Sequence, residues 1–145
     1  MVYWDTSALL KLYVMEEDSS HFDRLLSSSD QAIATSTIAV AEIHCVAYRK
    51  ESAGELKRGG AAAVVAGFQR DCRVGRIVQV PFGEDVMLHL DSFVRLAFGG
   101  PRPVMLRALD AIHVASAVSV RARSIVATDL RLRAMALRAG LAILP

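Results

Sequence analysis

The chain has 145 residues and a formal net charge of +2, a size that suits one domain with a single core and requires neither disulfides nor a structural metal. Hydrophobic residues make up 53% of the chain and its mean hydropathy is +0.34, so we expect some apolar surface to be buried against another chain. The composition argues against a membrane or secreted protein, because no apolar run approaches the roughly 18 residues of a membrane span and no basic segment typical of a signal peptide opens the chain.

The cysteines and the charges narrow the expectation further. Cys45 and Cys72 form no CxxC pair, so both are expected to be reduced in a cytoplasmic protein. Residues 1–30 contain six acidic and two basic residues, whereas residues 95–145 contain eight arginines and two acidic residues. Solvated surface arginines are the ordinary interpretation of this asymmetry, and a basic face that meets phosphates is the alternative.

Short β-prone segments alternate with helical ones along the chain. The expected strands cover residues 2–4, 32–35, 76–80, 124–127 and 141–144. The expected helices cover residues 8–14, 19–29, 38–46, 54–72, 84–96, 106–120 and 130–138. Such alternation predicts an α/β fold in which helices cover both faces of a parallel sheet, with one domain over residues 1–145.

One carboxylate lies inside the helix expected over residues 106–120. Asp110 has Leu106 at i−4, His113 at i+3 and Val114 at i+4, so its neighbours are mostly apolar. An ionised carboxylate in such a place is costly unless a positive or hydrogen-bonding group meets it.

Three further acids can lie at one edge of the sheet. Asp5 and Asp129 each follow an expected strand, and ligands of open parallel sheets collect at the carboxyl ends of strands. Glu42 lies near the start of a helix that follows a strand, again among apolar helical neighbours. Asp110 joins these acids if its helix runs back across the same rim. The alternative for Asp5 is a helix N-cap, a role that Asp favours.

Convergent carboxylates repel one another, and a divalent cation relieves this repulsion. Ligation by oxygen alone suits Mg²⁺ or Mn²⁺, whereas zinc requires Cys or His at ligand spacing. Such ions support hydrolysis at phosphorus. The chain has no phosphate-binding P-loop, dinucleotide-binding turn, serine-esterase elbow or HExxH motif, and Ser7 stands where a phosphoaspartate phosphatase needs a second Asp.

Four short motifs follow one another along the chain. They are Asp5-Thr6-Ser7, Glu42 soon after Ser36-Thr37-Ile38, the segment Leu109-Asp110-Ala111-Ile112-His113-Val114-Ala115-Ser116-Ala117, and Thr128-Asp129-Leu130-Arg131-Leu132. Together, in this order, they resemble the PIN domain in its VapC toxin form. The resemblance covers essentially the whole chain, and its most specific part is the segment that begins at Asp110.

The resemblance implies a three-layer α/β/α sandwich with a central, mainly parallel sheet. It also implies a Mg²⁺- or Mn²⁺-dependent endoribonuclease that is the toxin of a type II toxin–antitoxin pair, forms a homodimer and is inhibited by a small antitoxin protein. By motif match, the acids of the metal site are Asp5, Glu42, Asp110 and Asp129. Thr6 or Ser7 is then a supporting hydroxyl, and His113 is first a hydrogen-bonding support and second a proton carrier.

One position departs from the family pattern. Many relatives carry Thr two residues before the last acid, whereas this chain has Ala127 there and places the hydroxyl on Thr128. Whether Thr128 assists the site depends on where its side chain points.

The expected substrate is single-stranded or loop RNA, whose backbone can bend into an acidic pocket while arginines neutralise more of it. Tyr3 and Trp4 are expected in the core rather than at bases. We expect the apolar surface that meets a second copy or an antitoxin on the first two helices, at Leu9, Leu12, Tyr13 and Phe22.

Two alternatives remain open at this point. One is a PIN-like module that binds RNA or protein without cutting. The other is an unrelated α/β domain whose acids are caps and surface residues, which explains Asp5 and Asp129 but not the carboxylates on apolar helix faces.

Overall fold

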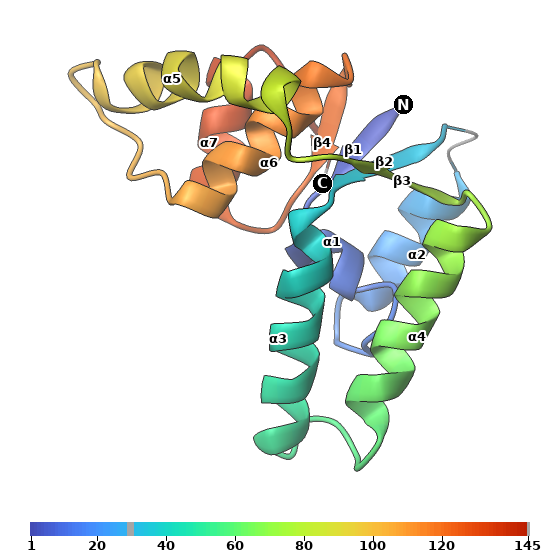
Figure 1. Cartoon of the computed structure of the whole chain (residues 1–145). Helices are drawn as coiled ribbons and strands as arrows, with labels where there is room; N and C mark the ends of the chain where they lie inside the picture. The colour runs from blue at the N-terminus through green and yellow to red at the C-terminus, as the bar shows by residue number, and fades with distance from the viewer. Residues whose placement is uncertain (29–30, 145) are drawn as a thin grey trace.

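A five-stranded sheet runs through the centre of the computed structural model, which describes residues 1–28 and 31–144 (Figure 1). Its strands are β1 (Val2–Trp4), β2 (Ile33–Ser36), β3 (Ile77–Val80), β4 (Ser124–Val126) and β5 (Ala142–Leu144). All neighbours pair in parallel, in the order β3-β2-β1-β4-β5. The chain therefore builds outward from β1 in both directions, and the carboxyl edge between β1 and β4 is a switch point where such sheets bind ligands.

Helices cover both faces of the sheet, so the predicted three-layer α/β/α sandwich is confirmed. One face carries α1 (Thr6–Leu10), α2 (Ser19–Ser27), α3 (Ile38–Ser52) and α4 (Gly60–Arg73). The other carries α5 (Glu84–Phe98), α6 (Ala108–Ser119) and α7 (Leu130–Arg138). Because side chains alternate along a strand, Val2 and Trp4 pack into the first layer and Tyr3 into the second.

Three helices differ from the prediction by more than two residues. The helix expected over residues 38–46 is α3, which continues to Ser52. The other two, α1 and α4, differ for local reasons. After Leu10 the chain continues in tight turns, with i→i−3 hydrogen bonds from the backbone nitrogens of residues 11–13, so α1 is shorter than expected. Residues 54–59 are not helical, because Gly54 and Gly59 adopt the left-handed φ values of 77° and 83°. The helix predicted over residues 19–29 is α2, and Ser29 lies outside the described residues.

The partner surface predicted on the first two helices is wrong. Leu9 and Phe22 are buried in the core, and Leu12 and Tyr13 pack against it. The chain's own α3 and α4 lie side by side over this region and supply the cover (Figure 1). Large exposed apolar side chains gather instead on α5, at Met87, Leu88, Val94, Leu96 and Phe98.

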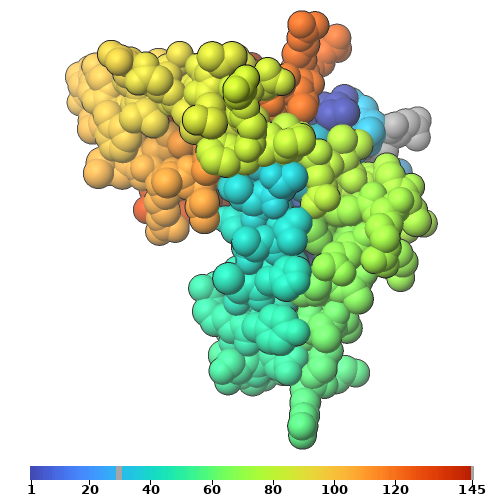
Figure 2. Space-filling model, viewed as in Figure 1, coloured from blue at the N-terminus to red at the C-terminus, as the bar shows by residue number. Residues whose placement is uncertain are grey.

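The space-filling view shows α5 on the outer surface, away from the projecting α3–α4 pair (Figure 2). Within the part of the chain that the structure describes, no helix has both the length and the apolar character that crossing a membrane requires.

Glu16 ties the segment after α1 to the end of α3. Its carboxylate pairs with Lys11 and, at 2.9 Å, with Lys50. The hydrogen bonds from Lys11 and Lys50 lower the pKa of Glu16 in the folded protein. We expect Glu16→Gln to lower the free energy of unfolding by about 1 kcal/mol at neutral pH.

The pH dependence of this effect follows from the lowered pKa. The carboxylate contributes stability above its unfolded pKa and loses it as the pH falls through the folded value, so the difference between Glu16→Gln and wild type should vanish in acid. Urea unfolding at several pH values measures this. Glu17→Gln is the control, because Glu17 is exposed and forms no ion pair among the described residues. Equal effects of the two variants at neutral pH contradict the prediction.

Candidate metal and nucleic-acid site

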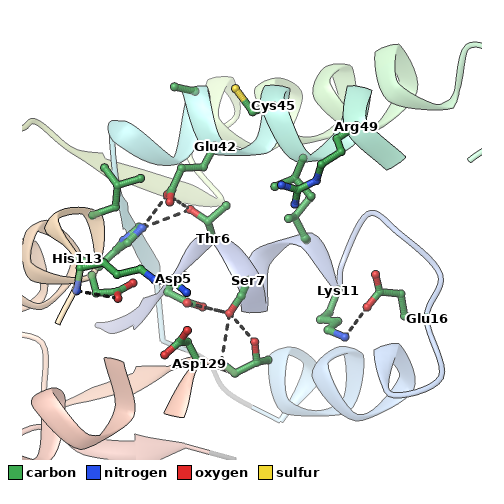
Figure 3. A pocket seen from close by; sticks show the side chains of 17 residues that line it. Asp5, Thr6, Ser7, Lys11, Glu16, Glu42, Cys45, Arg49, His113 and Asp129 are labelled. Carbon is green, nitrogen blue, oxygen red and sulfur yellow. Dashed lines mark hydrogen bonds and ion pairs between the residues drawn. The ribbon is translucent and has the colours of Figure 1, made fainter. Parts of the chain in front are cut away.

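A cavity of about 570 Å³ opens where β1 and β4 end, between α1, α3 and α6 (Figure 3). All eight residues singled out in the sequence line it: Asp5, Thr6, Ser7, Glu42, Asp110, His113, Thr128 and Asp129. They come from four segments that are far apart in the sequence. The expectation that these segments meet at one edge of the sheet is confirmed.

Asp5 follows β1 directly and is only 4% exposed. It is the N-cap of α1, because its carboxylate accepts a hydrogen bond from the backbone nitrogen of Ala8 at 2.9 Å. The Ser7 hydroxyl lies 2.8 Å from both carboxylate oxygens. Burial raises the pKa of Asp5, although the Ala8 hydrogen bond and nearby His113 act against the rise. The cap and the cavity acid are therefore the same residue.

Thr128 reaches the site through Ser7. Its hydroxyl donates to Ser7 Oγ at 2.6 Å, and its backbone nitrogen donates to the same oxygen at 3.2 Å. Ser7 in turn donates to Asp5. The Thr128 hydroxyl therefore orients Ser7, and Ser7 in turn orients Asp5. Thr128 itself has no hydrogen bond to Asp5 among the described residues.

Glu42 is held from two sides by one of its oxygens. Oε2 accepts from the Thr6 hydroxyl and lies 2.8 Å from His113 Nε2, while Oε1 has no hydrogen-bond partner among the described residues. Burial acts to raise the pKa of Glu42, but the hydrogen bond and charge of His113 and the Thr6 hydroxyl outweigh it and lower the pKa. His113 hydrogen-bonds to Glu42, and its role as a support of the site stays a prediction.

Tyr3 is a member of this network that the sequence interpretation assigned only to the core. Its side chain is fully buried, and its hydroxyl oxygen lies 2.7 Å from His113 Nδ1. The sequence alone could not predict this contact, because the partner of Tyr3 is 110 residues away along the chain.

Asp110 and Asp129 both line the cavity, and their pKa values are shifted in opposite directions. Burial raises the pKa of Asp110, despite a 3.3 Å hydrogen bond from the Arg107 backbone nitrogen, and the charge of Asp129 adds to the rise. Burial also acts on Asp129, but hydrogen bonds from the backbone nitrogens of Arg131 and Leu132, at 2.8 and 3.3 Å, lower its pKa. Asp129 is therefore the N-cap of α7 as well as a cavity acid.

The four carboxylates have the chemistry that a hard cation such as Mg²⁺ prefers, although they are too far apart to bind one ion together. In the described part of the chain, no three His, Cys, Asp or Glu side chains lie close enough to hold a metal ion as they stand. The acids offer only oxygen ligands, which Mg²⁺ and Mn²⁺ prefer. Nearby Glu42 and Asp129 add to the pKa rises of Asp5 and Asp110, respectively. A bound cation removes that electrostatic cost.

Basic side chains lie beside the acids. Lys11, Arg49 and Arg107 also line the cavity, from the end of α1, from α3 and from the start of α6. Lys11 is already paired with Glu16. Arg49 and Arg107 are exposed, so they can meet phosphate groups that approach the acids.

Comparison with known proteins agrees with this architecture. Residues 2–137 match the sequence profile of the PIN domain. The chain belongs to the PIN domain family. No curated protein matches this PIN domain in sequence.

Two solved structures share the PIN fold along nearly the whole chain. A chain of VapBC2 from Rickettsia felis, bound to a DNA fragment from its promoter, is 15% identical with a TM-score of 0.68. A chain of VapBC-1 from nontypeable Haemophilus influenzae is 16% identical with a TM-score of 0.69. In both cases the match covers 99% of this PIN domain and 97% of the other chain. At these identities the likeness concerns the fold.

Proposed function

We propose that this PIN domain is a Mg²⁺- or Mn²⁺-dependent endoribonuclease, the cytoplasmic toxin of a type II pair whose activity a cognate antitoxin inhibits. The observation that carries the proposal is the meeting of four acids, from four separate segments, in one cavity at the carboxyl edge of a parallel sheet. Membership of the PIN family and the fold shared with chains of VapBC complexes support it.

The residues that would hold the cation are Asp5, Glu42, Asp110 and Asp129. A divalent cation at such a site lowers the pKa of water and stabilises negative charge on the leaving oxygen of a phosphodiester. Ser7 and the Ala8 backbone orient Asp5, and Thr6 with His113 orients Glu42 so that Oε1 stays available. Asp5 and Glu42 are thus oriented by hydrogen bonds in the chain without a ligand.

The substrate that suits this cavity is single-stranded or loop RNA. Acids deep in the cavity repel a phosphate backbone, whereas exposed Arg49 and Arg107 at its walls attract one. A flexible strand can bend a phosphate into such a place more easily than a rigid duplex can.

The test is cleavage of a panel of structured RNAs by the purified chain, freed from any bound inhibitor, with Mg²⁺, with Mn²⁺ and with a chelator. We expect cutting with either metal and none with the chelator. RNA binding without cutting under any metal, from protein shown to be folded, would support the non-catalytic PIN-like binding module. That alternative is favoured by one observation, namely that no three ligand-type side chains in the described part of the chain lie close enough together to hold a metal ion.

Ser7→Ala should lower the cleavage rate by about 10-fold, as the loss of an outer hydrogen bond to a ligand does. Thr128→Val removes a hydrogen bond to Ser7 Oγ and should have a smaller effect in the same direction. Because Thr128 contacts Asp5 only through Ser7, adding Thr128→Val to Ser7→Ala should change the rate little further. Initial rates of the two single variants and the double variant measure this. If the rate losses of the two single variants add up in the double variant, Thr128 affects cleavage by a route other than Ser7.

We also propose a homodimer and an antitoxin complex. The exposed apolar side chains of α5 support a partner surface, because they remain uncovered in the isolated chain. Light scattering of the purified chain, alone and after co-expression with a candidate antitoxin, tests both assemblies. A chain that stays monomeric at high concentration and co-purifies with nothing contradicts them.

A further inference from the structure

A chain of hydrogen bonds runs from the core of the molecule to the floor of the cavity. The Tyr3 hydroxyl oxygen lies 2.7 Å from His113 Nδ1, and His113 Nε2 lies 2.8 Å from Glu42 Oε2 and 3.3 Å from Thr6 Oγ1. Tyr3 is 0% exposed and His113 is 2% exposed. Figure 3 shows the His113 ring pointing at Glu42 and Thr6 from the α6 side of the cavity.

The two nitrogens of the ring have different partners. A carboxylate only accepts hydrogen bonds, so His113 Nε2 is the donor to Glu42 Oε2. His113 Nδ1 meets the Tyr3 hydroxyl, so the ring is held at both ends.

The Tyr3 side chain is suited to this task because it is held rigidly. It is fully buried on the central strand β1. Its ring also packs edge-on against His113, with centroids 5.8 Å apart and planes at 70°. Tyr3 is thus a fixed hydrogen-bond partner on a central strand.

We propose that Tyr3 is a positioning residue that holds the His113 ring with Nε2 directed at Glu42, so that His113 and Thr6 occupy Glu42 Oε2 and leave Oε1 directed to the reaction. Tyr3 does not line the cavity and has no hydrogen bond to Glu42. Its effect passes through the His113 ring. The consequence for cleavage rests on the proposed ribonuclease function, whereas the hydrogen bonds of His113 do not.

The hydrogen bonds of the two ring nitrogens are measured first, by NMR of the full chain labelled with ¹⁵N-histidine at neutral pH. We expect His113 to show a protonated Nε2 that donates a hydrogen bond, and an Nδ1 that is hydrogen-bonded to the Tyr3 hydroxyl. In Tyr3→Phe, which keeps the ring and loses only the hydroxyl, the Nδ1 resonance should shift. Tyr13→Phe is the matched control, because Tyr13 donates its hydroxyl to Asp71 at 2.9 Å and does not line the cavity.

The effect on the site is measured by a double-mutant cycle. Tyr3→Phe should lower kcat for RNA cleavage about 10-fold with little change in KM, and should weaken Mn²⁺ binding by a similar factor. His113→Gln keeps a donor that can reach Glu42 but has no equivalent of Nδ1. Adding Tyr3→Phe to His113→Gln should therefore change kcat and Mn²⁺ affinity less than twofold.

Three results would overturn the assignment. They are a wild-type His113 whose Nε2 carries no proton, an Nδ1 resonance that is the same in Tyr3→Phe, and a Tyr3→Phe effect that is undiminished in the His113→Gln background. The first result is measured on the wild-type chain, so it tests the proposal even if Tyr3→Phe folds poorly. Normal NMR behaviour without any RNA cleavage would instead count against the ribonuclease function alone.

Discussion

Replacing Asp110 by Asn should lower RNA cleavage on the order of 10³-fold, the loss expected when about 4 kcal/mol of charge stabilisation disappears from a metal-assisted transition state. The fold should survive. Asp110 is half-buried and accepts one backbone hydrogen bond, from Arg107 at 3.3 Å, which the Asn oxygen can also accept. Burial already raises the pKa of Asp110, so a neutral side chain suits the position.

Asp91→Asn is the matched control for this variant. Asp91 lies on α5, is exposed and pairs with Arg95 at i+4, outside the cavity. Initial rates measure cleavage, and a gel-shift assay measures RNA binding. Asp110→Asn should bind RNA at least as well as wild type, because it removes a negative charge from a phosphate-binding cavity. Cleavage at the wild-type rate would contradict the assignment of Asp110 to the reaction.

The placement of Asp5, Asp129 and Glu42 could be predicted from the sequence because it depends on local rules. An acid that follows a parallel strand lies at the carboxyl edge, and the sheet order then sets which acids are neighbours. The position of Asp110 could not be predicted from local rules alone. Its helix reaches the same rim because α6 packs on the sheet with its N-terminus at this edge, and that depends on long-range packing.

Two features could not be predicted, for the same physical reason. The contact of Tyr3 with His113 requires the register of α6 against β1, across 110 residues of sequence. The burial of Leu9 and Phe22 requires β1, α3 and α4 of the same chain to pack against α1 and α2. An amphipathic pattern shows which side chains will be covered, but it does not show whether the cover comes from the same chain.

The N-cap interpretation of Asp5 and Asp129 and the functional interpretation are not alternatives in this fold. A parallel strand that leads straight into a helix puts the N-cap at the carboxyl edge of the sheet, which is also where ligands bind. The same carboxylate then begins a helix and faces the cavity. The two caps differ in how well hydrogen bonds stabilise the ionised carboxylate against burial, because the pKa of Asp5 is raised and that of Asp129 is lowered.

Replacing Asp5 by Asn should stabilise the fold while abolishing cleavage. Asn caps helices about as well as Asp, so Ala8 and Ser7 keep an acceptor and only the charge is lost. Burial raises the pKa of Asp5, which means that the folded protein holds this ionised carboxylate at a cost. Removing it should raise Tm by about 2–4 °C, or about 1 kcal/mol in a domain of this size.

Asp129→Asn is the matched comparison, and its expected effect has the opposite sign. Backbone hydrogen bonds at the start of α7 outweigh burial and lower the pKa of Asp129, so its charge favours the folded state. Asn in its place should lower the free energy of unfolding by about 0.5–1 kcal/mol, the value of a charge at a helix N-terminus. Both variants are measured by thermal unfolding with a chelator present, so that no bound cation compensates the acids. If Asp5→Asn unfolds at a lower temperature than wild type, the buried carboxylate stabilises the fold. That result would contradict the prediction that Asp5 lowers stability in exchange for catalysis.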